Sequence, residues 1–239
     1  MAQHISRKEL KTDEVHAALE QGWQALLSHE KFTIGVLILA IVVVAGVYGW
    51  RWYSESQASH AETDFTAAMD IFQAPVGPPQ TPGQLTYTDE NRKFTEAGQA
   101  FAKVAKNYGR TRSGQLAAYY AALSDEKLKN DAAAEKWLDG IKGSKDAEVA
   151  SIAKFELAGL YALDGKTDQA IPIYQALMAQ PTILVPKPEA MLALANCYRA
   201  KDPAQAAKLY GQIKTDYPDT PIADQADEAL ALLPAASKS

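Results

Sequence analysis

The chain has 239 residues and carries 24 Lys and Arg against 29 Asp and Glu, a formal net charge of −5. This acidic balance without a basic patch argues against nucleic acid as a partner. One cysteine, Cys197, excludes an intramolecular disulfide. All four histidines lie between positions 4 and 60, so the rest of the chain lacks the commonest general base and metal ligand.

Residues 1–31 are predicted to form a cytoplasmic segment with a short amphipathic helix. Apolar residues recur at helical spacing from Val15 to Leu27 and share one face. The polar side carries acidic residues between Asp13 and Glu20, which do not suit an anionic inner leaflet. The sequence leaves two occupants open for the apolar face, a lipid surface or a protein partner.

Residues 32–53 are predicted to be a transmembrane signal anchor in contact with the lipid bilayer. No charged side chain occurs from Phe32 to Trp50, and a helix of that length spans roughly 29 Å, close to the hydrocarbon thickness of a bilayer. The cluster Trp50–Tyr53 is typical of the headgroup level. A cleaved signal peptide would need a shorter core close to a small-residue cleavage site. A soluble core would have to enclose the helix on all sides.

The charges that flank this span predict its orientation. Four cationic residues precede it: Arg7, Lys8, Lys11 and Lys31. After it comes Arg51, and the next cationic residue is Arg92. Because Lys and Arg are retained on the cytoplasmic side, the N-terminus is predicted to be cytoplasmic and the C-terminal part extracytoplasmic.

Residues 54–88 are predicted to form a juxtamembrane helix and a Pro-rich linker. No Pro or Gly interrupts the chain between Arg51 and about Phe72. Several Pro and Gly residues between Pro75 and Gly83 then exclude a helix and favour an extended, semi-rigid segment. Thr88 is the predicted N-cap of the next helix.

Residues 89–234 repeat with a nearly constant period. The aromatic residues Phe101, Trp137, Tyr174 and Tyr210 are separated by 36, 37 and 36 residues, and alanines 16 positions later keep the same register. Such a period predicts stacked helix pairs rather than unrelated amphipathic helices. In the clearest unit, a turn at Gly165 separates the two helices. The predicted fold is therefore all-α, an N-terminal transmembrane helix followed by an α-solenoid, with a disordered tail at 235–239.

These repeats resemble the tetratricopeptide repeat, in which small residues lie at the crossing of two helices beside large aromatics. Ala158 or Gly159, with Ala170, fit the small positions, and Tyr161 and Tyr174 fit the large ones. The resemblance implies a solenoid that binds peptides or other proteins.

The order of anchor and repeats resembles the bacterial ancillary Sec translocon subunit family. The matching features are Asp13-Glu14, the end of the span from Gly46 to Trp52, and the repeat layout. The resemblance implies a single-pass inner-membrane protein whose periplasmic repeats associate with the translocon and with periplasmic chaperones. The Pro-rich hinge and the segment Tyr217–Pro221 look closer to envelope-assembly and cell-wall or cell-division adaptors. A non-catalytic subunit of a membrane enzyme is a third interpretation.

No catalytic, cofactor or metal site is expected, and no small-molecule substrate. Cys197 lies on a repeat helix without a nearby histidine and is predicted to be a buried structural residue. The adjacent acids Asp125 and Glu126 are predicted to lie on solvated faces. Asn196 and Arg199 share one helical face and are the candidate partner-binding residues, with solvation or capping of the next turn as the alternative.

Overall fold

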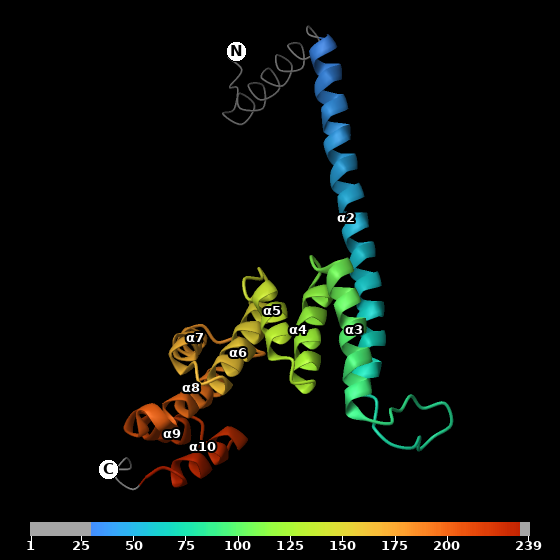
Figure 1. Ribbon diagram of the computed structural model, residues 1–239. Helices are drawn as coiled ribbons and strands as arrows, with labels where there is room; N and C mark the ends of the chain where they lie inside the picture. The colour runs from blue at the N-terminus through green and yellow to red at the C-terminus, as the bar shows by residue number, and fades with distance from the viewer. Residues whose placement is uncertain (1–29, 235–239) are drawn as a thin grey trace, which may run out of the picture. The chain divides into compact units, whose positions relative to one another are not determined.

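The computed structural model describes residues 30–234, and it is helical with connecting loops throughout that range (Figure 1). The helices are α2 (Glu30–Gln73), α3 (Glu90–Tyr108), α4 (Arg112–Lys127), α5 (Asp131–Ile141), α6 (Ala147–Leu163), α7 (Thr167–Ala179), α8 (Lys187–Lys201), α9 (Pro203–Asp216) and α10 (Pro221–Ala231). This confirms the all-α fold class. The amphipathic helix expected before residue 30 and the tail at 235–239 lie outside the described residues.

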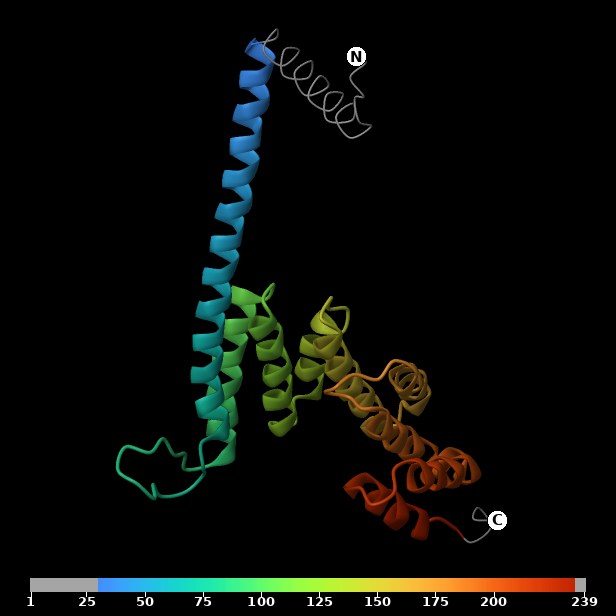
Figure 2. The same cartoon turned by 180° about the vertical axis from the view of Figure 1, so that it is seen from behind.

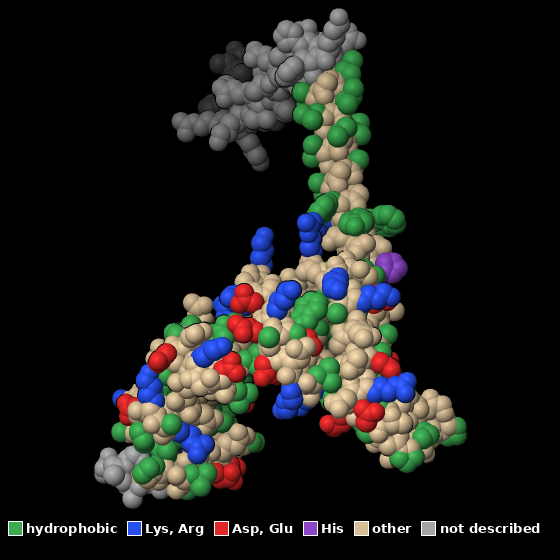
Figure 3. Space-filling model, in the orientation of Figure 1, with side chains coloured by type: hydrophobic (Ala, Val, Ile, Leu, Met, Phe, Trp, Pro, Cys, Tyr) green, Lys and Arg blue, Asp and Glu red, His purple; other side chains and the backbone are tan. Residues whose placement is uncertain are grey.

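The chain divides into two compact units, Met1–Ser56 and Gln57–Ser239. In the first unit, the described part of α2 is apolar, and side chains such as Leu37 and Ile41 are about two-thirds exposed. Its best window has a mean hydropathy of 2.1, and none of that window is buried. Figure 3 shows hydrophobic side chains on this part of α2. The helix is therefore long and apolar enough to cross a membrane.

The second unit begins with the last part of α2, residues 57–73. Phe65, Ala68 and Phe72 lie on one face of this helix and pack into the core of the repeats. The ring of Phe65 lies 5.6 Å from that of Phe101, and the ring of Phe72 lies 5.5 Å from that of Phe94. Residues that the sequence suggested as a juxtamembrane helix outside the repeats are thus part of the same compact unit.

The Pro-rich segment after α2 closes into a loop instead of extending. The Gly77 N–H donates to the Tyr87 carbonyl at 2.9 Å, and the Tyr87 N–H donates to the Pro75 carbonyl at 3.0 Å. Gly77 (φ 127°) and Gly83 (φ 81°) adopt backbone conformations that glycine alone adopts easily. The expected extended spacer is therefore wrong, and α3 instead runs back alongside residues 57–73 (Figure 2).

The N-cap of α3 is Asp89 and not Thr88. The Asp89 carboxylate accepts a hydrogen bond from the Arg92 N–H at 2.8 Å, and Thr88 donates its hydroxyl to that same carboxylate. A carboxylate at this position also interacts favourably with the positive end of the helix dipole. This explains why the acid takes the cap in preference to the hydroxyl.

The repeat helices form two layers. Helices that are consecutive from α3 to α10 pack against one another, and further contacts join α4 with α6, α6 with α8, and α8 with α10. Among the described helices, no contact joins α3 with α5, α5 with α7, or α7 with α9. We therefore call α4, α6, α8 and α10 the inner layer and α3, α5, α7 and α9 the outer layer. An inner layer with closer spacing is expected for a curved solenoid.

Fully buried alanines occupy the small positions of the repeat, where the two helices of a pair are expected to cross. Each of three helix pairs has one such alanine on either helix: Ala122 and Ala134 in α4–α5, Ala158 and Ala170 in α6–α7, and Ala195 and Ala206 in α8–α9. Ala158, rather than Gly159, takes the small position, because Gly159 is partly exposed. The turn at Gly165 is confirmed: its φ is +75°, and the Lys166 N–H donates to the Tyr161 carbonyl at 2.8 Å.

Candidate protein-binding surface

A tyrosine and a carboxylate join two helices of the inner layer. The Tyr119 hydroxyl on α4 donates to Oε1 of Glu156 on α6 at 3.1 Å. Burial raises the pKa of Glu156, and the bond from Tyr119 opposes that rise. Burial also raises the pKa of Tyr119, followed in size by the nearby Glu156 charge. The phenol therefore stays protonated and acts as the donor over the physiological pH range.

Glu126 lies two turns beyond Tyr119 on α4, so both residues share one face. Its Oε1 atom is buried and has no hydrogen-bond partner among the described residues. Burial, then the charges of Glu156 and Asp131, raise the pKa of Glu126 to about 7, while Lys127 opposes the shift. The prediction that this acid lies on a solvated face is wrong for one carboxylate oxygen, which is buried, while the residue as a whole is half-buried.

The inner layer thus carries an acceptor-rich patch between α4 and α6. Within this patch, Oε1 of Glu126 is an acceptor without a hydrogen-bond partner among the described residues, and the atom is buried rather than presented at the surface. The repeat period of the sequence indicates the Tyr119–Glu156 contact. Tyr119 and Glu156 are 37 residues apart, one repeat period, so neighbouring inner helices bring them together.

Asn196 makes a contact inside its own repeat. The hydroxyl of the fully buried Tyr210 donates to the Asn196 side-chain oxygen at 2.6 Å. The bond ties α8 to α9 and occupies the amide oxygen. The amide nitrogen makes no hydrogen bond within the described part of the chain, and the side chain as a whole is exposed. Asn196 can therefore offer a partner the hydrogen-bond donor of its amide nitrogen.

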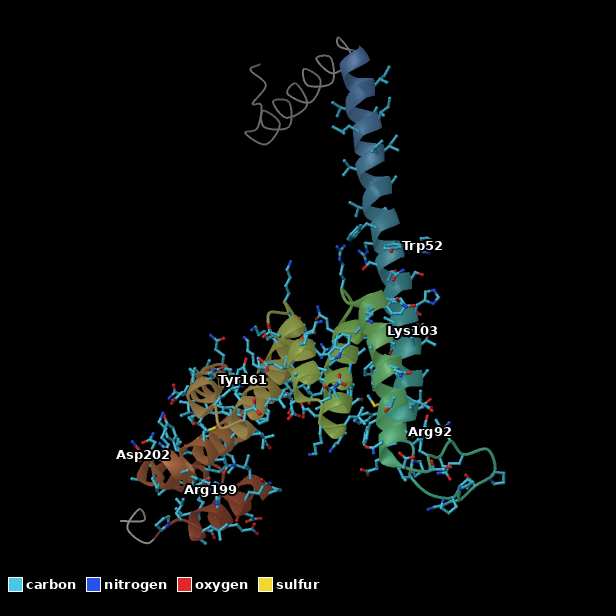
Figure 4. All side chains as sticks on the ribbon, in the orientation of Figure 1. Trp52, Arg92, Lys103, Tyr161, Arg199 and Asp202 are labelled. Carbon is cyan, nitrogen blue, oxygen red and sulfur yellow. The ribbon has the colours of Figure 1, made fainter. Side chains whose placement is uncertain are left out.

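Arg199 lies one turn beyond Asn196 on α8 and is exposed (Figure 4). It belongs to no ion pair among the residues that the structure describes. Burial raises the pKa of Tyr210, and the nearby Arg199 guanidinium opposes the rise. Both candidate residues therefore lie close to Tyr210. Their role in partner binding stays a prediction.

The preceding repeat lacks this arrangement. Gly159 stands 37 positions before Asn196, and Tyr174 stands 36 positions before Tyr210. A side chain at Gly159 would place its Cβ 3.7 Å from the Tyr174 hydroxyl. Glycine offers no acceptor side chain, and the Tyr174 hydroxyl makes no hydrogen bond to another described residue. Burial, and then the nearby Cys197 and Glu156, raise the pKa of Tyr174. The tyrosine–amide contact thus distinguishes the α8–α9 repeat from the α6–α7 repeat.

Cys197 is free and buried, as the sequence predicted. Burial raises the pKa of its thiol, which lowers the population of the nucleophilic thiolate. Among the described residues, no group of three or more His, Cys, Asp or Glu side chains is placed to hold a metal ion.

Known proteins resemble this chain in fold and, over most of its length, in sequence. The model of a tetratricopeptide repeat-like domain family matches residues 24–181. The crystal structure of Podosopora anserina putative kinesin light chain nearly identical TPR-like repeats superimposes with a TM-score of 0.52 at 17% identity. That superposition covers 73% of this chain and 85% of the other. No curated protein sequence matches the chain.

The structural likeness shows a shared fold. The family match reaches further, because it covers more than half of the chain and includes the apolar part of α2 as well as the helices through α7. Repeats of this kind act typically as surfaces that bind other proteins. The chain belongs to the tetratricopeptide repeat-like domain family.

Proposed function

We propose that the protein is a non-enzymatic scaffold, anchored in a bacterial inner membrane, that binds other proteins through the inner layer of its repeats. Residues 32–53 serve as the anchor, the N-terminus is cytoplasmic, and the repeats lie on the periplasmic side. The observation that carries this proposal is the extent of the family match. Residues 24–181 are matched as one unit, so the apolar helix and the repeats belong together in this family.

As a finer proposal, the protein is an ancillary subunit of the Sec translocon that works with periplasmic chaperones. The support is the order of its parts: the acids Asp13-Glu14, one apolar helix ending near Trp52, and then the repeats. An extracytoplasmic repeat surface beside a translocon could hold emerging chains or chaperones. The exposed donors of Asn196 and Arg199 suit the carbonyl groups of an extended backbone and polar side chains.

Site-specific photocrosslinking in cells tests which proteins occupy this surface. A photoreactive residue replaces Arg199 on the inner layer, and the matched control replaces Gln175, an exposed residue of outer helix α7. Translocon subunits and chaperones should crosslink from position 199 and not from position 175. Outer-membrane or cell-wall machinery would favour the envelope-adaptor function instead, and a single membrane enzyme would make the protein a subunit of it. Equal crosslinking from both positions would show that the inner layer is not the binding surface.

Topology is tested separately. A reporter that is active only outside the cytoplasm, fused after Ser239, should be active, and alkaline carbonate should not extract the chain from membranes. A cytoplasmic C-terminus would overturn the translocon proposal, because the repeats would then lie on the wrong side.

A further inference from the structure

Two turns bring cationic side chains together at one end of the repeat unit. The α3–α4 turn and the α5–α6 turn are adjacent, because Arg112 pairs with Asp146 at 3.1 Å and the Ser144 hydroxyl donates to the Gln115 side chain at 2.7 Å. Both turns line a hollow of about 660 Å³. A more apolar hollow of about 620 Å³ adjoins it and shares four lining residues, among them Ile141.

The rim of the two hollows is strongly cationic in a chain that is acidic as a whole. We call its six cationic residues the basic edge: Lys106, Arg110, Arg112, Lys136, Lys142 and Lys145. The same linings contain two acids, Asp139 and Asp146, which pair with Lys142 and Arg112. The other four cations form no ion pair among the residues that the structure describes. Figure 3 shows blue side chains projecting from this end of the repeat unit.

The basic edge lies where α2 enters the repeat unit. Tyr108 at the end of α3 lies near Asp64 of α2 and packs against the same core as Phe65, so the α3–α4 turn lies beside the first residues of the second unit. Gln57, the first residue of that unit, follows Tyr53 at the end of the predicted span by four residues. Four residues reach at most about 14 Å even when fully extended. The short link therefore leaves the edge within reach of the bilayer surface.

We propose that the basic edge binds the headgroups of anionic phospholipids in the bilayer that holds α2. The inference rests on the proposed function, because it requires α2 to span that bilayer. Unpaired cations close to an anionic surface are attracted to it, and each contributes roughly a factor of five to association. The adjoining apolar hollow suits a ligand that is polar at one end and apolar at the other. Such binding holds the repeat domain against the membrane and orients its inner layer.

The test uses the full-length chain reconstituted in nanodiscs, after alkaline carbonate has shown that the chain is integrated in native membranes. A fluorophore is placed on Gly143→Cys, in the exposed α5–α6 turn, in a Cys197→Ala background. A control fluorophore is placed on Leu163→Cys, which is 86% exposed at the other end of α6. The discs contain either phosphatidylcholine alone or a mixture with phosphatidylglycerol, together with a lipid that carries a quencher on its headgroup.

The label at position 143 should be quenched in the mixed discs and not in pure phosphatidylcholine, while the label at position 163 should be quenched in neither. Neutralising three unpaired cations, with Lys106→Gln, Arg110→Gln and Lys145→Gln, should lower the docking equilibrium roughly a hundredfold. Lys129→Gln, Lys154→Gln and Lys208→Gln remove the same charge outside the edge and should leave it unchanged. Raising the salt to about 1 M, where the Debye length is roughly 3 Å, should abolish docking.

Several outcomes would overturn the inference. Equal quenching at position 143 in both lipid mixtures, or a triple variant that docks like its control, would exclude anionic lipid recognition while leaving the anchored scaffold intact. Extraction by carbonate would overturn the anchor and this inference together. If the edge variant instead lost a protein crosslink in native membranes, without lipid-dependent quenching in discs, the edge would be a site for an acidic protein.

Discussion

The two ends of the solenoid are closed in different ways. At the front end, residues 57–73 of α2 place Phe65 and Phe72 against Phe101 and Tyr120, with ring centroids 5.4 to 6.0 Å apart. At the rear end, the short helix α10 buries small and aliphatic residues: Ile222, Ala223 and Ala226. The front end is therefore covered by a long helical segment with aromatic side chains. The rear end is covered by a short helix with small and aliphatic side chains, which is the last helix of the described residues.

This difference shows that the helix carrying the apolar span also serves as the cap of the repeats. A solenoid needs a terminal element with one apolar and one polar face, since its end repeats have no further neighbour. Here the front cap is not a separate helix but the continuation of α2 beyond Ser56. A truncation that removes all of α2, and not only the apolar span, therefore also removes part of the hydrophobic core of the repeats.

The largest effect is expected from truncation at the front end. A fragment comprising residues 57–239 should fold, whereas a fragment comprising residues 89–239 should lose most of its stability. The shorter fragment lacks Phe65 and Phe72 and exposes Phe94 and Phe101, and each buried phenylalanine contributes about 1.5–3 kcal/mol. Urea unfolding followed by circular dichroism measures the difference. Deleting residues 221–239 at the rear should cost less. Equal midpoints for the two front fragments would contradict the capping role.

The second prediction tests the aromatic core with a single substitution. Phe101 is fully buried and contacts rings from both α2 and α4, so Phe101→Ala should destabilise the protein by about 3–5 kcal/mol. Leu163→Ala, at a residue that is 86% exposed, should change stability by less than about 0.5 kcal/mol. Thermal unfolding of the purified full-length chain compares the two. If Phe101→Ala lowers the stability only slightly, the ring contacts of Phe101 contribute little to the stability of the fold.

The third prediction moves to the middle of the solenoid, where small residues set the packing. Ala170 is fully buried at the crossing of α6 and α7, so Ala170→Leu should overpack the crossing and cost about 1–3 kcal/mol. The same change at the exposed Gln175 of α7 serves as the control and should be close to neutral. If the two variants melt at one temperature, the assignment of the crossing position is wrong.

The smallest effect concerns the carboxylate of Glu126 on the inner layer. Its pKa is raised to about 7 from 4.5, so the folded state holds the proton more tightly than the unfolded state. Stability from this group is therefore highest below about pH 4.5 and falls as the pH rises towards about 7. Glu126→Gln should remove that loss and stabilise the protein at pH 8 by about 1 kcal/mol, a value reduced for solvent screening of this half-exposed group.

The measurement is the free energy of unfolding in urea at two pH values, one acidic and one alkaline, for both proteins. The free energy of unfolding of Glu126→Gln should exceed that of the unmodified chain only at the alkaline pH. Glu228→Gln, at an exposed residue of α10, should follow the unmodified chain at both. A gain of the same size at both pH values would mean that the charge of Glu126 is not what destabilises the fold.

The sequence by itself determined the features that repeat locally. The apolar stretch after Phe32 predicted a membrane-length helix, and the regular spacing of markers such as Tyr174 and Tyr210 predicted stacked helix pairs. The turn at Gly165 and the burial of Cys197 also followed from local pattern. Such features depend on residues within one helix or on a fixed period, and both can be read along the chain.

Only the tertiary structure decided which helical faces meet. It joined residues 57–73 to the repeats through ring contacts with Phe94 and Phe101. It also partly buried Glu126 and brought Glu156 close to it, and these two effects, burial first, raise the pKa of the Glu126 carboxyl group. The oxygen of Asn196 is occupied by Tyr210, and the loop after α2 closes on Tyr87, through contacts between different elements. Burial and charge depend on the neighbour across a helix interface, and the local sequence pattern carries no record of that neighbour.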